Sequence, residues 1–111
     1  MSATSLDAIA ASLTDILNTT YSDAKKFDGS QHGVVIQLIV ELLEKANQIR
    51  ESGKPLTTKE REAVVIKAGH LLLVQIRGAS DPYTLLYDEI AVSVLNAILF
   101  VEVEVRNCWC K

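Results

Sequence analysis

Residues 57–77 read TTKEREAVVIKAGHLLLVQIR, and this stretch decides the fold of the chain. Thr57 and Glu60 have the spacing of a capping box, in which each side chain accepts a hydrogen bond from the other residue's backbone. The residues that follow are apolar on nearly every side of a helix. A helix with so narrow a polar face is normally buried, so residues 58–77 are predicted to form the central helix of the domain.

Two residues interrupt this apolar helix. Gly69 has no side chain, and it is predicted to let a neighbouring helix approach closely. Lys67 is predicted to extend its charged end to solvent or to pair with an acidic residue of another helix.

Two further helical segments are predicted before the central one. The first covers about residues 5–27 and ends at residues 28–30, Asp-Gly-Ser. The second covers about residues 31–52 and ends because Gly53 and Pro55 follow it. In both, apolar residues recur at intervals of three and four, which predicts one buried stripe per helix. The stripes are Leu6, Ile9, Ala10, Leu13, Ile16, Leu17, Tyr21, Ala24 and Phe27 in the first segment, and Val35, Leu38, Ile39, Leu42, Leu43, Ala46 and Ile49 in the second.

A fourth segment begins at Asp81 and Pro82, with the aspartate as N-cap and the proline at the first helical position. Residues 100–106 alternate apolar and charged side chains, which is also the pattern of a half-buried strand. We predict that the helix continues through them, with an extended tail as the alternative. The apolar residues of this segment are Leu85, Leu86, Ile90, Val94, Leu95, Ala97, Ile98 and Val101.

The breaks between the four segments are short, as in helix–helix connections of antiparallel bundles. The chain is therefore predicted to be all-α, a single helical domain over residues 1–111 with the up-down connections of a four-helix bundle. The third and fourth segments are expected to form a buried hairpin, against which the first two pack.

Composition narrows the class of protein. The 111 residues are 49% hydrophobic and carry 11 basic and 14 acidic side chains, a net charge of −3. This share of hydrophobic residues excludes a disordered chain, and the mild acidity disfavours nucleic-acid binding, which needs a basic face. The longest apolar stretch, residues 90–101, is shorter than the roughly 20 residues of a membrane span. Without a basic, apolar leader, an intracellular, cytoplasmic location is predicted.

The residues that could carry chemistry form no recognisable motif. His32 and His70 are predicted to be a helix-start surface residue and a partly buried structural residue. A single residue separates Cys108 and Cys110, whereas zinc sites place two to four between paired ligands. Residues 108–111 match a prenylation box only in outline. No catalytic, cofactor-binding or metal residues and no cofactor are predicted, and the protein is not expected to be an enzyme. A catalytic site around His70 is the third hypothesis for its function.

Two of the four helices are apolar on more than one side, which exceeds what one small bundle readily buries. The leading hypothesis is a non-enzymatic protein-protein interaction or assembly protein that associates with itself as a homodimer or higher oligomer, and possible roles include that of a viral or phage structural or accessory protein. A compact monomer and a helical binding module for a small apolar ligand are the alternatives. The predicted interface residues are Leu72, Val94, Ile98 and Val101.

Overall fold

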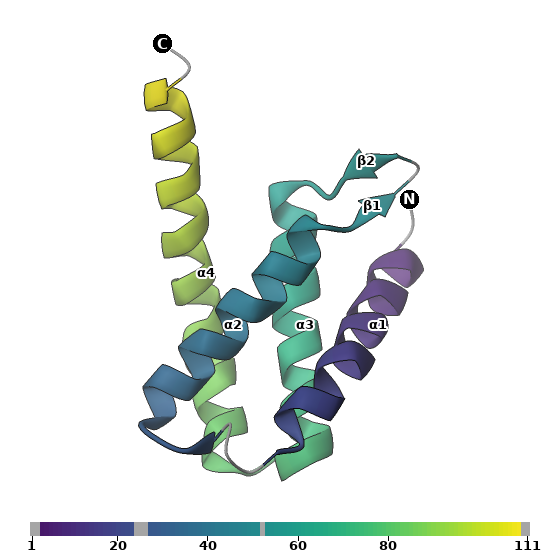
Figure 1. The fold of residues 1–111 in the computed structure, drawn as a ribbon, viewed down its shortest axis with the longest axis vertical. Helices are drawn as coiled ribbons and strands as arrows, with labels where there is room; N and C mark the ends of the chain where they lie inside the picture. Colours follow the sequence, from purple (N-terminus) through teal and green to yellow (C-terminus); the bar gives the residue numbers. More distant parts are fainter. Residues whose placement is uncertain (1–2, 24–26, 52, 110–111) are drawn as a thin grey trace.

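The computed structural model describes residues 3–23, 27–51 and 53–109 and consists of four long helices with a short hairpin. Successive helices run in opposite directions (Figure 1), so the predicted all-α, antiparallel four-helix bundle is confirmed. No helix in the described part of the chain combines the length and hydropathy that a membrane crossing requires. The elements are α1 (Ala3–Tyr21), α2 (Gln31–Asn47), β1 (Arg50–Glu51), β2 (Lys54–Pro55), α3 (Thr58–Arg77) and α4 (Pro82–Trp109).

Helix α3 occupies the centre of the bundle, where it contacts α1, α2 and α4. It begins at the predicted capping box: the Thr57 hydroxyl accepts from the Glu60 backbone N–H at 3.2 Å, and the Glu60 carboxylate accepts from the Thr57 backbone N–H at 2.8 Å. Lys67 pairs with Asp7 of α1, with 2.5 Å between Nζ and Oδ1. The predicted central helix is confirmed, and its buried residues are Val64, Val65, Ala68, Gly69, Leu72 and Leu73.

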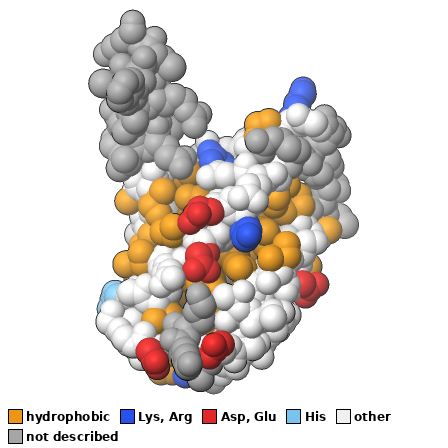
Figure 2. Space-filling view, in the orientation of Figure 1, with side chains coloured by type: hydrophobic (Ala, Val, Ile, Leu, Met, Phe, Trp, Pro, Cys, Tyr) orange, Lys and Arg blue, Asp and Glu red, His pale blue; other side chains and the backbone are white. Residues whose placement is uncertain are grey.

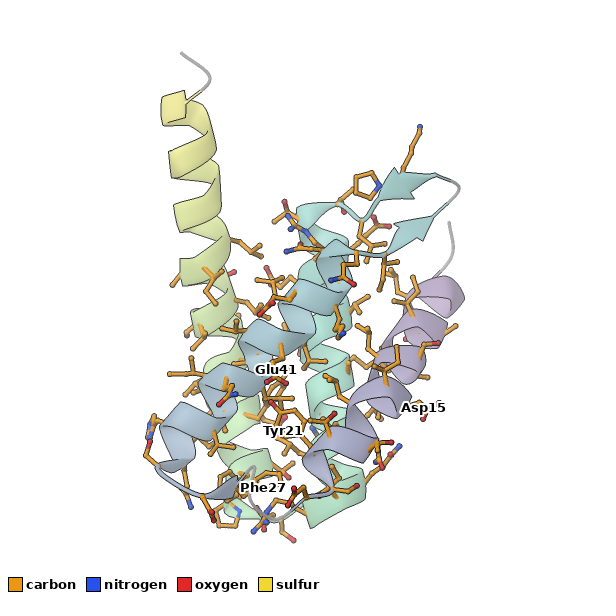
Figure 3. The ribbon with its side chains drawn as sticks, viewed as in Figure 1. Asp15, Tyr21, Phe27 and Glu41 are labelled. Carbon is orange, nitrogen blue, oxygen red and sulfur yellow. The ribbon has the colours of Figure 1, made fainter. Side chains whose placement is uncertain are left out.

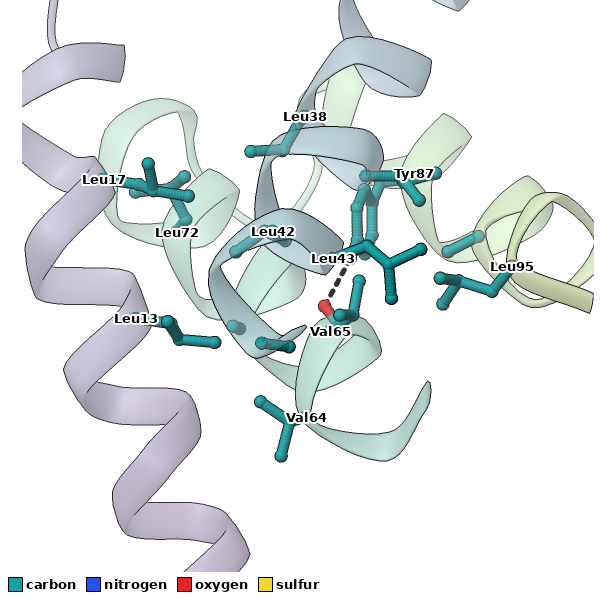
Figure 4. Close-up of a cluster of buried hydrophobic side chains, with 14 of the residues drawn as sticks. Leu13, Leu17, Leu38, Leu42, Leu43, Val64, Val65, Leu72, Tyr87 and Leu95 are labelled. Carbon is teal, nitrogen blue, oxygen red and sulfur yellow. Dashed lines mark hydrogen bonds between the residues drawn. The ribbon is translucent and has the colours of Figure 1, made fainter. Parts of the chain in front are cut away.

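The contact between α3 and α4 depends on Gly69. A Cβ at this position would lie 2.0 Å from Cζ of Tyr87, so the tyrosine ring occupies the space that any other residue would fill. The Tyr87 hydroxyl passes the glycine and donates to the Val65 carbonyl oxygen at 2.5 Å (Figure 4). Burial, together with the nearby Asp88 carboxylate, raises the pKa of Tyr87 and keeps this donor protonated.

Small residues bring α1 close to α3 in the same way. Thr14 of α1 is buried, and its hydroxyl lies 2.9 Å from the Ala10 carbonyl oxygen and 3.2 Å from that of Ala68 in α3. Both alanines are fully buried. The buried side of α1 therefore includes Thr14, which the apolar pattern omitted. Ile16, predicted to lie in the buried stripe, is instead exposed.

Two predicted helix ends are wrong. Helix α2 ends at Asn47 rather than at residue 52, and the chain then forms a hairpin in which Arg50 pairs with Pro55. Gly53 has φ of 81°, a backbone conformation that favours glycine. This glycine therefore turns the hairpin, and it does not end helix α2. Helix α1 ends at Tyr21 rather than at Phe27. The predicted stripe residue at position 24 lies outside the described residues.

Phe27 leaves the helix because it packs into an aromatic cluster at the end of the bundle that holds both the α1–α2 and the α3–α4 connection. Its ring meets those of Tyr21 and Tyr83 edge-on, and its carbonyl oxygen accepts from the Tyr83 hydroxyl at 2.9 Å. The Arg77 guanidinium lies over the Phe27 and Tyr83 rings and donates to Asp81 at 3.0 Å. The predicted N-cap is confirmed, since Asp81 also accepts from the Tyr83 backbone N–H.

Helix α4 is the longest element, and it continues through residues 100–106, so the prediction of a helix there is confirmed and the extended alternative is wrong. Its upper end extends beyond the other three helices (Figure 1). The 28 residues of α4 make about 42 Å of helix, against about 30 Å for the 20 residues of α3.

We expect Gly69→Ala to lower the free energy of unfolding by about 2 kcal/mol, because the added methyl group displaces the Tyr87 ring. An alanine in place of an ordinary helical glycine has the opposite effect, a gain of up to about 1 kcal/mol. Urea denaturation followed by circular dichroism measures the sign. An increase in stability would show that Tyr87 does not pack against this glycine.

Asp81 gives a second prediction. Burial alone would raise the pKa of Asp81, but the hydrogen bonds from Arg77 and the Tyr83 backbone and the Arg77 charge together lower it. The carboxylate therefore stabilises the fold above its unfolded pKa, and this contribution is lost as pH falls through the lower folded pKa. We expect Asp81→Ala to cost about 1 kcal/mol at pH 7.

The difference between wild type and Asp81→Ala should shrink as the pH is lowered below about 4, where the wild-type carboxyl group takes up its proton. Asp81→Asn is the matched control, since it keeps an acceptor for the Tyr83 N–H and should cost less. Denaturation curves between pH 7 and pH 2 measure both, and a difference independent of pH would contradict the role of the charge.

Candidate functional site

The four predicted interface residues do not lie on one surface. Leu72 is 0% exposed and packs in the chain's own core, next to Leu17 of α1 (Figure 4). Val94 and Ile98 of α4 are partly buried, so each keeps a portion of its side chain at the surface. The side chain of Val101 lies outside the described residues. Only Val94 and Ile98 are therefore described at a surface that another molecule could reach.

Other incompletely covered apolar side chains lie on α2 and α4, which contact each other. Leu43 of α2 points toward α4 (Figure 4), and Ile36 and Val40 precede it at helical spacing, so they lie on the same side of α2. Ile36 and Val40 are 41% and 38% exposed. Figure 2 shows apolar side chains gathered where α2 crosses α4. We call this the α2/α4 apolar surface, and it consists of Ile36, Val40, Ile90, Val94 and Ile98.

This part of α4 has no charged residue from residue 90 to residue 101. Yet the bundle does not fully enclose it, because Val94 and Ile98 are only partly buried and Ala97 beside them is exposed. Exposed sides of helices usually carry charged residues, and the buried centres of protein–protein interfaces are depleted of them. The α2/α4 apolar surface therefore has the composition of an interface rather than of a solvated helix.

His70 has an acidic partner that the sequence did not indicate. Its Nδ1 lies 2.8 Å from Oδ1 of Asp88 on α4, and both side chains are 44% exposed. A carboxylate in this position can orient an imidazole for proton transfer. The pair links the outer sides of α3 and α4 at the surface, away from the cleft described below, and provides no substrate pocket by itself. The prediction of a structural His70 bonded to a neighbour fits this geometry.

Among the described residues, no three His, Cys, Asp or Glu side chains lie close enough together to hold a metal ion. His32 is exposed at the start of α2, as predicted. The side chain of Cys108 and the whole of Cys110 lie outside the described residues, so the expectations for zinc binding and for prenylation stay predictions.

A cleft of about 220 Å³ lies between α1 and α2. At its side, Tyr21 and Glu41 lie close together (Figure 3), and the Tyr21 hydroxyl donates to Oε2 of Glu41 at 2.8 Å. The Gln37 amide donates to Oε1 of the same carboxylate at 3.2 Å. Burial raises the pKa of Tyr21, as does the hydrogen bond to Glu41. The Glu41 carboxylate therefore accepts hydrogen bonds from one residue of α1 and one of α2. The lining residues are Leu17, Thr20, Glu41, Glu44, Lys45 and Gln48.

Five of the six lining residues have polar side chains, so the cleft lacks the predominantly apolar lining of a site for a small apolar ligand. The sequence carried a weak signal of this arrangement. Tyr21 fell in the predicted buried stripe, and a buried tyrosine needs an acceptor for its hydroxyl. The identity of that acceptor depends on how α1 and α2 are placed side by side, and spacing along one helix does not specify it.

Comparison of the chain with models of protein families, with curated proteins and with solved structures finds no match.

We expect Tyr21→Phe to lower the free energy of unfolding by about 1.5–3 kcal/mol, the usual value of a hydrogen bond to a charged acceptor. Thermal and urea denaturation measure this loss. Gln37→Ala, which removes the other and more exposed donor to Glu41, is the control and should cost less. Equal effects of the two variants would contradict a special role for the tyrosine.

Proposed function

We propose that the protein associates with itself through the α2/α4 apolar surface and acts as a non-enzymatic assembly protein. The observation that carries the proposal is the stretch of α4 that has no charged residue and that the chain's own helices leave partly uncovered. Val94 and Ile98 belong to the α4 part of this surface, and Ile36 and Val40 form its α2 part.

The area of the molecule supports the proposal. Its accessible surface is 6668 Å², whereas a compact monomer of 12.2 kDa exposes about 6,100 Å². The radius of gyration is 14.3 Å, and a compact chain of this length has about 13.2 Å. The chain is therefore more extended than a typical compact monomer of its mass, as expected of a subunit in an assembly.

The absence of charge favours a second copy as the partner. In a two-fold symmetric interface, a surface meets itself, so each charged group faces its like-charged copy or must be offset by an opposite charge. An uncharged apolar surface can meet its own copy without repulsion, and burying it stabilises the pair by about 25 cal/mol per Å².

We expect Ile98→Asp to reduce the solution mass to that of the monomer, because it buries a charge against its own copy at the interface. Size-exclusion chromatography with light scattering measures the mass over a hundredfold range of concentration, with reductant present. The matched control is Val92→Asp, which places the same charge on an exposed part of the opposite side of α4 and should leave the oligomer unchanged.

Because Ile98 is partly buried in its own bundle, its aspartate variant could also disturb the fold. Ala97→Arg avoids this problem, since Ala97 is exposed and lies beside the same surface. It should give a folded monomer, with the helical signal of the wild type by circular dichroism. A monomeric wild type, or an oligomer that persists in both the Ile98 and the Ala97 variant, would overturn the proposal.

A further inference from the structure

We draw no further inference here: the strongest candidate, the half-exposed His70–Asp88 pair between α3 and α4, has beside it no third side chain among the described residues that would complete a metal site, and nothing in the structure shows what it would act on.

Discussion

The close contact between Gly69 and Tyr87 is the constraint on which the arrangement of the helices depends. It fixes how near α4 lies to the central helix and at which level, because the tyrosine ring fits only where no Cβ is present. The hydroxyl of Tyr87 then reaches the Val65 carbonyl oxygen. This contact fixes the level of α4 beside α3, and the aromatic cluster around Phe27 closes the end of the bundle where α4 begins, so the extra length of α4 emerges at the other end.

The hydroxyl groups of four side chains inside the bundle have hydrogen-bond acceptors within the chain. Thr14, Tyr21, Tyr83 and Tyr87 each donate their hydroxyl hydrogen to a carbonyl or carboxylate oxygen of the chain. A buried hydroxyl without a partner would cost about 1–3 kcal/mol, so these bonds specify the packing as well as stabilise it. The core of the bundle is therefore well packed. The uncovered apolar side chains of α2 and α4 do not result from a loose core, and they are a feature of the surface.

The sequence predicted what depends on local chemistry and periodicity. The capping box at Thr57, the cap at Asp81, the close approach at Gly69 and the buried stripe of α2 all follow from neighbours within a turn of helix, and the structure bears them out. It could not predict the hairpin after α2, because a glycine after an apolar run can end a helix or turn two strands.

A second limit on prediction from the sequence is that a helix with apolar residues on nearly every side does not reveal which side is buried. In α4, periodicity did not indicate which side faces α3, so Tyr87 and Ala91 were omitted from the predicted set and the exposed Leu85 was included. Leu72 was chosen as an interface residue for the same reason, although α3 is covered on three sides. The Tyr21–Glu41 and His70–Asp88 contacts join different helices, and they depend on tertiary placement alone.

Once the structure shows which sides of α3 and α4 are covered by other helices, the apolar residues on their uncovered sides can be identified. The apolar residues of α3 are needed for packing against the three helices around it. Those on the first half of α4 are needed for packing against α2 and α3. The chain's own helices cover Val94 and Ile98 only in part. The sequence from residue 90 to residue 101 contains no charged residue that would favour exposure to solvent. The α1–α2 cleft, whose lining includes Glu41, Glu44 and Lys45, is not the enclosed apolar cavity that a small apolar ligand would need. The proposed self-association through the α2/α4 apolar surface would bury these side chains against a second copy.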